Sequence, residues 1–349
     1  MDTKVVRIDE SHKDEALLRE AGEIIQSGGL VAFPTETVYG LGGDALNPAS
    51  SRKIYEAKGR PSDNPLIVHI ADMEALPVIV KSVPETAKKL ADAFWPGPLT
   101  MIMEKSDLVP KETTGGLDTV AVRMPSDAVA LSFIRAAGGY VAAPSANRSG
   151  RPSPTRASYV AQDMDGRIEM ILDGGDVTLG LESTIVDLTV EPPTILRPGF
   201  ITGEMLRQKL GRVEEDGTLF RADSGQAPKA PGMKYRHYAP EGELVIVKGA
   251  AAAVTDYING RLLEGRRGHK KTGVIATDET IAAYGADVSR SVGKRADAAA
   301  AAKGLYRILR EFDDEGVELI YSESFDGEGV SQAVMNRLLK AAGHRVIDV

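Results

Sequence analysis

Residues 30–70 read LVAFPTETVYGLGGDALNPASSRKIYEAKGRPSDNPLIVHI, and this stretch predicts the fold class. The first four residues and the last five are short apolar runs of the kind that form buried strands. Between them, Asn47 and Pro48 are typical of a helix N-cap and first turn, and Gly59 is typical of a helix end. The order strand, helix, strand indicates an α/β protein.

The same alternation continues to about residue 210. Leu17, Ala21, Ile24 and Ile25 share one face of a predicted helix, and a second helix is predicted over 85–94. Further short strands are predicted at 99–103, 119–124, 140–143, 170–173, 183–188 and 194–196. Many short strands with interleaved helices predict a twisted mixed sheet that is covered by helices on both sides.

The pattern changes after residue 210. Residues 211–240 are rich in Gly, Pro, Asp and Lys and have no periodicity, so we interpret them as a linker between the domain 1–210 and a second domain. From residue 241 to 349, strand-like runs at 244–247, 273–276 and 317–321 alternate with Ala/Leu-rich helices. This predicts a smaller, Rossmann-like, three-layer α/β domain, although no G-x-G-x-x-G follows its first strand.

Composition excludes several classes of function. The 349 residues carry a formal net charge of -8 and no cysteine, so disulfides, zinc-thiolate sites and cysteine nucleophiles are excluded. The acidic balance argues against a broad nucleic-acid-binding face. No signal peptide and no apolar run long enough to span a membrane can be recognised, so a cytoplasmic location and no membrane partner are expected by default.

Two polar segments after predicted strands are candidate sites. In the segment 34–42, threonines, a glutamate and a tyrosine follow a strand, although a turn capped by its own threonines explains them equally well. Lys58 and Arg60 together suit a phosphate or a carboxylate. Their alternative role is to complement the dipole at a helix C-terminus, but the rigid polar loop that follows favours a site.

Other charged side chains lie in or after strands. Arg123 lies within a predicted strand and needs a partner, which is either a distant carboxylate or the anion of a ligand. The segment 143–156 holds three arginines and no acid, and Ser153 there is predicted to cap a following helix and so create an anion site. A solvated basic loop is the alternative. Arg197, Ser183 and His69 are weaker candidates.

Four motifs taken in order carry a resemblance. P-T-E-T-V-Y-G-L-G at 34–42, K-G-R at 58–60, S-A-N at 145–147 and H-Y-A-P at 237–240 together resemble the L-threonylcarbamoyladenylate synthase family. The resemblance covers the whole chain and matches the long form, with a YrdC-like catalytic domain (1–210), a linker (211–240) and a C-terminal domain (241–349).

The resemblance implies a nucleotidyltransferase. Such enzymes condense L-threonine, bicarbonate and ATP, which carries Mg²⁺, into threonylcarbamoyl-AMP and pyrophosphate. The product then passes to a separate transferase complex that modifies tRNA. By this resemblance the catalytic positions are Lys58, Arg60, Ser145 and Asn147. The threonine-binding positions are Thr35, His69, Arg123 and Ser183. The ATP-binding positions are Lys58, Ser62, Thr119, Ser145, Ser153, Arg197 and Tyr238. No metal site made of protein ligands is expected, and the linker with Tyr238 is expected to act as a lid.

Two alternatives remain. A related carbamoyl-adenylate chemistry occurs in hydrogenase-maturation proteins, but those are longer and carry cysteine-rich zinc motifs, which this chain lacks. The chain could instead be a nucleotide- or RNA-binding module without adenylating activity. Its acidic balance and the absence of interleaved aromatic residues weigh against this, and against stable direct binding of tRNA.

Overall fold

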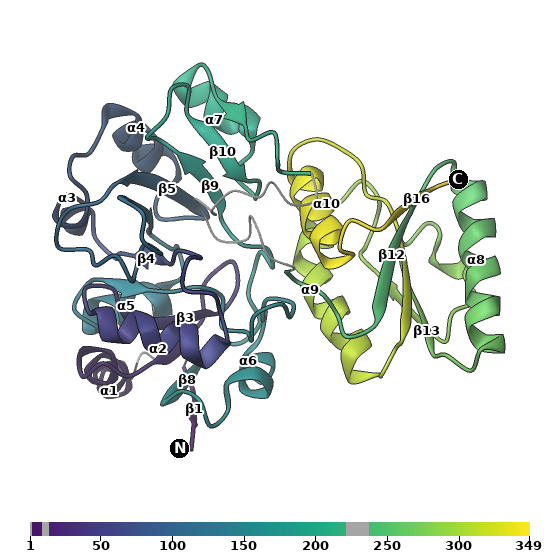
Figure 1. The fold of residues 1–349 in the computed structure, drawn as a ribbon, viewed down its shortest axis with the longest axis horizontal. Helices are drawn as coiled ribbons and strands as arrows, with labels where there is room; N and C mark the ends of the chain where they lie inside the picture. Colours follow the sequence, from purple (N-terminus) through teal and green to yellow (C-terminus); the bar gives the residue numbers. More distant parts are fainter. Residues whose placement is uncertain (1, 9–13, 221–236) are drawn as a thin grey trace. The chain divides into compact units, whose positions relative to one another are not determined.

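The structure is a computed structural model that describes residues 2–8, 14–220 and 237–349 (Figure 1). The chain divides into two compact units. The first contains the residues before Gly150 together with 153–219, and the second contains 150–152, Phe220 and the chain from 237 onward. The short segment 150–152 therefore belongs to the second unit although the first unit precedes and follows it in sequence.

The first unit is built on a mixed sheet with the strand order β1-β8-β2-β3-β7-β4-β6-β5-β9-β10-β11. The strands are β1 (Lys4–Arg7), β2 (Val31–Phe33), β3 (Gly40–Asp44), β4 (Ile67–His69), β5 (Leu99–Glu104), β6 (Thr119–Arg123), β7 (Val141–Ala142), β8 (Met170–Asp173), β9 (Thr184–Asp187), β10 (Thr194–Arg197) and β11 (Glu214–Glu215). The helices are α1 (Glu15–Gln26), α2 (Pro48–Lys58), η1 (Met73–Ala75), α3 (Leu76–Ile79), α4 (Glu85–Phe94), α5 (Ala128–Ala136), α6 (Ala157–Met164) and α7 (Gly203–Leu210).

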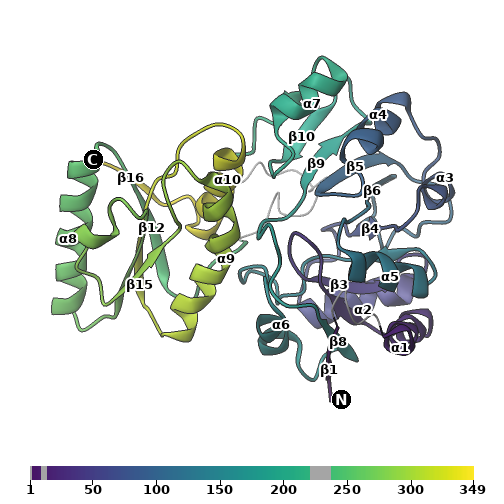
Figure 2. The same ribbon diagram turned by 180° about the vertical axis from the view of Figure 1, so that it is seen from behind.

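Helices cover the two faces of this sheet unequally. Alternate residues of β2 point to opposite faces, so that Val31 and Phe33 pack with α1 and α5, whereas Ala32 packs in the cluster that includes α2, α4, α6 and α7. Figure 2 shows these helices from behind. Farther along the sheet, a third cluster contains only strand side chains, namely Ile67, Ile102, Ala121, Ile185 and Leu196. This strand-only face carries the polar side chains described below.

Most elements of the first unit agree with the sequence-based predictions. Asn47 caps α2 through Ala49 N–H, Pro48 occupies its first turn, and Gly59 ends it with a φ of 61°. Three strands, β1, β3 and β11, were not predicted. Strand β3 consists of Gly-Leu-Gly-Gly-Asp and has no apolar alternation, yet its glycines allow close packing, since a Cβ on Gly42 would lie 2.9 Å from Val141 Cγ1.

The second unit has a five-stranded sheet in the order β14-β13-β15-β12-β16, and every pairing in it is parallel. Its strands are β12 (Glu243–Lys248), β13 (Thr272–Ala276), β14 (Val288–Ser291), β15 (Leu319–Glu323) and β16 (Val346–Asp348). Its helices are α8 (Ala251–Arg267), η2 (Ile281–Ala283), α9 (Ala298–Asp314) and α10 (Val330–Ala341). Figure 1 shows α8 on one side of this sheet and α9 and α10 on the other, which confirms the predicted Rossmann-like, three-layer architecture.

The segment predicted as a linker and lid, 211–240, lies only partly within the described residues. Its first part includes β11, which pairs parallel with β10 and so extends the sheet of the first unit. Residues 221–236 lie outside the described residues. None of the helices in the described ranges combines the length and the apolar character that crossing a bilayer requires.

Candidate active site

A row of polar side chains crosses adjacent strands of the first unit. His69 at the end of β4 lies beside Arg123 at the end of β6, and Arg123 lies opposite Thr100 on β5. All three side chains are at least 95% buried. Because residues two apart share a face, they lie on the same face as Ile67, Ala121 and Ile102 of the strand-only cluster.

Ser183 and Arg197 extend the row to β9 and β10. The Ser183 hydroxyl is 2.7 Å from the Thr100 hydroxyl, and Arg197 donates to the Ser183 carbonyl at 3.0 Å and to its hydroxyl at 3.2 Å. The structure therefore brings together three residues predicted at widely separated positions, His69, Arg123 and Ser183, with Arg197 beside them. Thr100 was missed by the sequence analysis, although a threonine within the otherwise apolar run 99–103 of β5 could have indicated it.

The loop after β2 supplies the partner that Arg123 needs. An Arg123 Nη atom lies 2.7 Å from a Glu36 carboxylate oxygen, and another donates to the Thr37 hydroxyl at 2.9 Å. Of the two partners left open by the sequence, the protein itself supplies the carboxylate. The Thr35 hydroxyl accepts from Thr37 N–H and Val38 N–H and donates to the Val38 carbonyl at 2.7 Å, so it shapes the turn as the alternative interpretation expected.

Lys58 connects α2 to the loop that carries the S-A-N motif. Its side chain is buried, and its ammonium donates to the carbonyls of Ser145 and Asn147. The Ser145 hydroxyl in turn donates to Asn147 Oδ1 at 2.5 Å. Three of the four predicted catalytic residues, Lys58, Ser145 and Asn147, are thus in direct contact.

Backbone hydrogen bonds hold the loops of the site together. Tyr39 N–H donates to the Pro154 carbonyl and Ala146 N–H donates to the Tyr39 carbonyl, which joins the loop after β2 to the S-A-N loop. Leu179 N–H donates to the Glu36 carbonyl at 2.8 Å, which joins the same loop to the segment before β9. The residues that contact Arg123 and those that contact Lys58 therefore lie on one continuous, cross-linked set of loops.

The predicted helix cap at Ser153 is wrong. Helix α6 begins at Ala157 with Arg156 at its N-cap position, whereas the Ser153 hydroxyl donates to Glu182 Oε1 at 2.6 Å. Ser153 precedes a proline, Pro154, and the proline ring disfavours helical backbone at the residue before it. Ser153 instead anchors the S-A-N loop to the segment that leads to Ser183.

The other predicted site residues lie at varied positions. The Arg60 guanidinium is buried and donates to the Asn64 and Pro65 carbonyls, while Ser62 lies in an exposed turn of the same loop. Thr119 begins β6 on the same face as Arg123, about 13 Å along the strand. Tyr238 belongs to the second unit, where its buried ring packs 5.1 Å from that of Tyr306.

His69 is neutral in this environment. Burial first, and then the positive charge of Arg123, lower the pKa of His69 to about 3. One ring nitrogen, Nδ1, is 3.1 Å from the Ile67 carbonyl and can bond it only as a donor, so Nε2 is the acceptor nitrogen. At neutral pH His69 can therefore accept a hydrogen bond but carries no charge.

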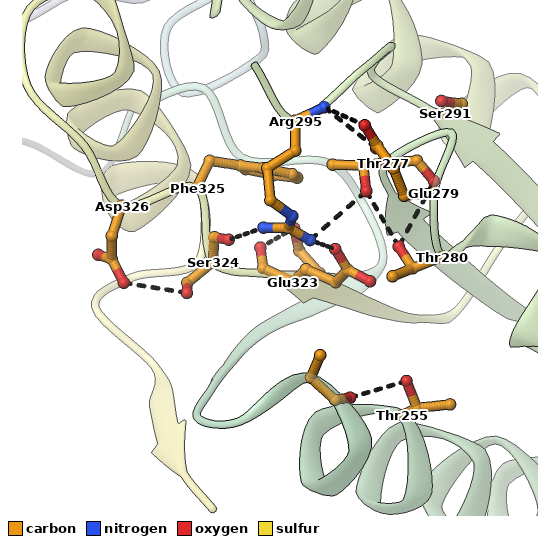
Figure 3. Close-up of polar contacts among 12 residues, drawn as sticks. Thr255, Thr277, Glu279, Thr280, Ser291, Arg295, Glu323, Ser324, Phe325 and Asp326 are labelled. Atoms are coloured by element: carbon orange, nitrogen blue, oxygen red, sulfur yellow. Dashed lines mark hydrogen bonds and ion pairs between the residues drawn. The ribbon is translucent and has the colours of Figure 1, made fainter. Parts of the chain in front are cut away.

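The second unit has a polar cluster of its own at the carboxyl ends of β13 and β15. Arg295 forms an ion pair with the buried carboxylate of Glu323 and donates to the Ser324 carbonyl and the Thr277 hydroxyl (Figure 3). The Tyr284 hydroxyl donates to the other Glu323 oxygen at 2.7 Å. These contacts satisfy Glu323 within the protein, so the cluster ties the strand ends together.

Metal ligands do not gather anywhere in the parts of the chain that the structure describes, since no group of three or more His, Asp or Glu side chains could hold an ion there.

Comparisons with known proteins agree with these features. A family model described as "Telomere recombination" (Sua5_yciO_yrdC) matches residues 23–199, and a model for the C-terminal domain of threonylcarbamoyl-AMP synthase matches 201–343. A threonylcarbamoyl-AMP synthase of Bacillus subtilis is 47% identical over 340 residues, which cover 97% of this chain and 96% of the relative. One of Pyrococcus abyssi is 47% identical over 336 residues, with 96% and 97% covered.

A solved structure extends the similarity to three dimensions. The crystal structure of Sua5 from P. abyssi in complex with L-threonine superposes with a TM-score of 0.94 at 45% sequence identity, over 99% of this chain and all of that one. The similarity to this relative therefore extends over both units. The chain belongs to the threonylcarbamoyl-AMP synthase family, in the long form that carries the C-terminal domain.

Proposed function

We propose that the protein condenses L-threonine, bicarbonate and ATP into threonylcarbamoyl-AMP and pyrophosphate. The observation that carries this proposal is the buried polar row of His69, Arg123, Ser183 and Arg197 beside the loop of Glu36, in a chain 45% identical to a relative crystallised with L-threonine. Buried cations and hydroxyls on an otherwise apolar sheet face suit a small, charged and polar substrate.

Threonine would occupy this row. Its carboxylate suits the Arg123 guanidinium, whose fork can bind a carboxylate bidentately. Its side-chain hydroxyl suits the acceptor nitrogen of neutral His69 or the Ser183 hydroxyl. Thr35 would contribute by shaping the turn that holds Glu36 and Thr37 next to Arg123.

ATP would lie along the connected loops and the far end of β6. Lys58 and the S-A-N residues Ser145 and Asn147 would face its phosphates, and Arg60 supports the adjoining loop through the Asn64 carbonyl. Thr119 is about 13 Å from Arg123 along β6, a separation that leaves room for a nucleoside beside the amino acid. The remaining nucleotide contacts are assigned to Ser62, Ser153, Arg197 and Tyr238.

The chemistry requires no protein nucleophile. The threonine amine attacks the carbon of bicarbonate, water leaves, and the resulting N-carboxythreonine attacks the α-phosphorus of ATP with release of pyrophosphate. Negative charge grows on carbamate and phosphate oxygens, where fixed cations and N–H groups stabilise it. Holding three substrates in line supplies much of the remaining rate enhancement.

Magnesium is proposed to enter with ATP. Mg²⁺ commonly binds through substrate phosphates and a few waters or carboxylates rather than in an all-protein cage. When bound, it would neutralise part of the phosphate charge. The product would then go to a tRNA-modifying transferase complex, and a cytoplasmic location is proposed together with that role.

The test measures pyrophosphate release by the full-length protein. Release that requires both L-threonine and bicarbonate is expected, with a threonylcarbamoyl-AMP product detected by mass spectrometry. Pyrophosphate release that is independent of threonine would contradict the proposal, and ATP binding without any turnover would favour a nucleotide-binding module.

A further inference from the structure

The carboxylate of Glu36 is buried without a hydrogen-bond donor. The residue is 7% exposed, and neither Oε1 nor Oε2 accepts a hydrogen bond from any residue that the structure describes. Arg123 lies 2.7 Å away and balances the charge, but its nearest Nη atom is also outside hydrogen-bonding geometry. A buried carboxylate that lacks its hydrogen bonds is costly, so such a group indicates a missing partner.

The loop backbone holds this carboxylate in place. The Glu36 carbonyl accepts hydrogen bonds from Leu179 N–H at 2.8 Å and from the Thr178 hydroxyl at 3.2 Å. The neighbouring Thr37 hydroxyl accepts from Arg123 at 2.9 Å. The Glu36 carboxylate oxygens and the Arg123 Nη atom, which lack hydrogen bonds, therefore lie next to each other. Arg123 is part of the row that the proposed function assigns to threonine, and Glu36 lies beside it.

An α-amino acid is complementary to this pair. Its carboxylate can accept a hydrogen bond from Arg123, and its ammonium can donate one to Glu36. A single zwitterion can therefore supply the hydrogen bonds that both side chains lack. Resting on the proposed function, we propose that Glu36 binds the α-ammonium of threonine and takes its proton, which makes it a catalytic residue of the reaction.

The proton transfer balances. Glu36 carboxylate and the threonine ammonium give a carboxylic acid and a neutral amine, and the amine nitrogen then forms a bond to the bicarbonate carbon. The attacking nitrogen gives up a proton to the hydroxide that leaves this carbon, so water departs and the carbamate forms. Glu36 then releases its own proton to solvent, which restores the carboxylate and balances the overall reaction. The unprotonated amine is essential because an ammonium has no lone pair with which to attack.

Other bases of the site are less suited to this role. Glu182 is also buried, but it already accepts from the Ser153 hydroxyl at 2.6 Å. His69 is neutral and can accept a hydrogen bond, but it offers no charge to an ammonium. Among the described residues of the row and of the adjoining loop after β2, only Glu36 has a buried carboxylate whose oxygens accept no hydrogen bond.

The test compares two ligands on the full-length protein. L-Threonine carries the ammonium, whereas 2,3-dihydroxybutanoate of the same configuration has a hydroxyl in its place. Calorimetry should show that Glu36→Gln weakens binding of threonine at least tenfold and changes binding of 2,3-dihydroxybutanoate less than about twofold. A merely structural role would weaken both ligands alike, and that result, or equal threonine binding by both proteins, would overturn the inference.

Kinetics supply the second readout. In Glu36→Gln the KM for ATP should stay within about twofold of the original value, whereas kcat should be lower than in the original protein. The kcat of the variant should increase about tenfold for each unit of increasing pH, because solvent must take the proton of the ammonium. A flat pH profile with unchanged kcat would contradict the base role. Glu169→Gln is the matched control, since Glu169 accepts from Leu30 N–H away from the row and should leave both ligands unaffected. If the unaltered protein neither binds threonine nor forms product, the proposed function has failed instead.

Discussion

The Arg123 guanidinium lies 2.7 Å from the Glu36 carboxylate, and both side chains are more than nine-tenths buried. One residue ends a central strand and the other lies in the loop after β2, so the pair joins the sheet to the loops of the candidate site. Buried ion pairs contribute little net stability when intact, but breaking one leaves an uncompensated charge in the interior. Substitution of either residue is therefore expected to lower both the stability of the protein and its affinity for threonine.

Replacing Arg123 should affect both properties. Arg123→Gln is expected to lower the free energy of unfolding by about 3–5 kcal/mol, because Glu36 stays buried without a cation. Threonine affinity should fall as well. Urea denaturation and calorimetry measure the two effects. Arg135→Gln is the control: Arg135 pairs with Asp72 but is 52% exposed, so its loss should cost less than about 1 kcal/mol. Equal losses in the two variants would contradict the prediction.

Lys58 should be essential for turnover. Lys58→Ala removes the ammonium that holds the Ser145 and Asn147 carbonyls and the charge proposed to face ATP. Pyrophosphate release should fall by about 10²–10³-fold while circular dichroism stays unchanged. Lys53→Ala in the same helix, which removes a bond to the Gly28 carbonyl, should keep nearly full activity. Normal turnover by Lys58→Ala would mean that this lysine only complements the dipole at the end of its helix and takes no part in catalysis.

His69 should make the protein less stable in acid. Its pKa is lowered from 6.5 to about 3 on folding, first by burial and then by Arg123. Between these values the unfolded chain holds one proton more than the folded protein, so stability falls as pH falls, by about 1.4 kcal/mol per pH unit for this group. Above a pH of about 6.5 the contribution is constant. His69→Gln removes it.

Denaturation of the original protein and of His69→Gln at several pH values between about 4 and 7 tests this expectation. The stability of the original protein relative to the variant should decrease steadily toward low pH. A difference that does not depend on pH would mean that folding leaves the pKa of His69 unchanged.

Arg310 should hold the segment 150–152, which belongs to the same unit as Arg310 itself. Its guanidinium is fully buried and donates twice to the Pro152 carbonyl, at 3.0 and 2.6 Å. Arg310→Met should lower the free energy of unfolding by about 1–3 kcal/mol and raise the KM for ATP, because this segment continues directly into the S-A-N loop. Arg307→Met, on the same helix but 38% exposed, should change neither quantity appreciably. An unchanged KM for ATP in Arg310→Met would mean that the position of this segment does not affect ATP binding.

Local patterns predicted much of the fold. Asn47, Pro48 and Gly59 define helix α2 through short-range capping that needs no tertiary context. The apolar runs at 30–33, 66–70 and 170–173 contain strands, because nearly all of their side chains are buried on the two faces of the sheet. Strand β3 was missed because its glycines contribute close packing against Val141 rather than an apolar pattern.

The sequence by itself determined the α/β class, the division into a large and a small unit, and the polar segments that form the site, because capping, periodicity and residue order are local properties. Only the tertiary structure decided that Arg123 pairs with Glu36, that Ser153 bonds Glu182 rather than caps α6, and that Thr100 joins the polar row. These contacts depend on strand order and register, and hydrogen bonds between residues far apart in the chain leave no periodic signal in the sequence.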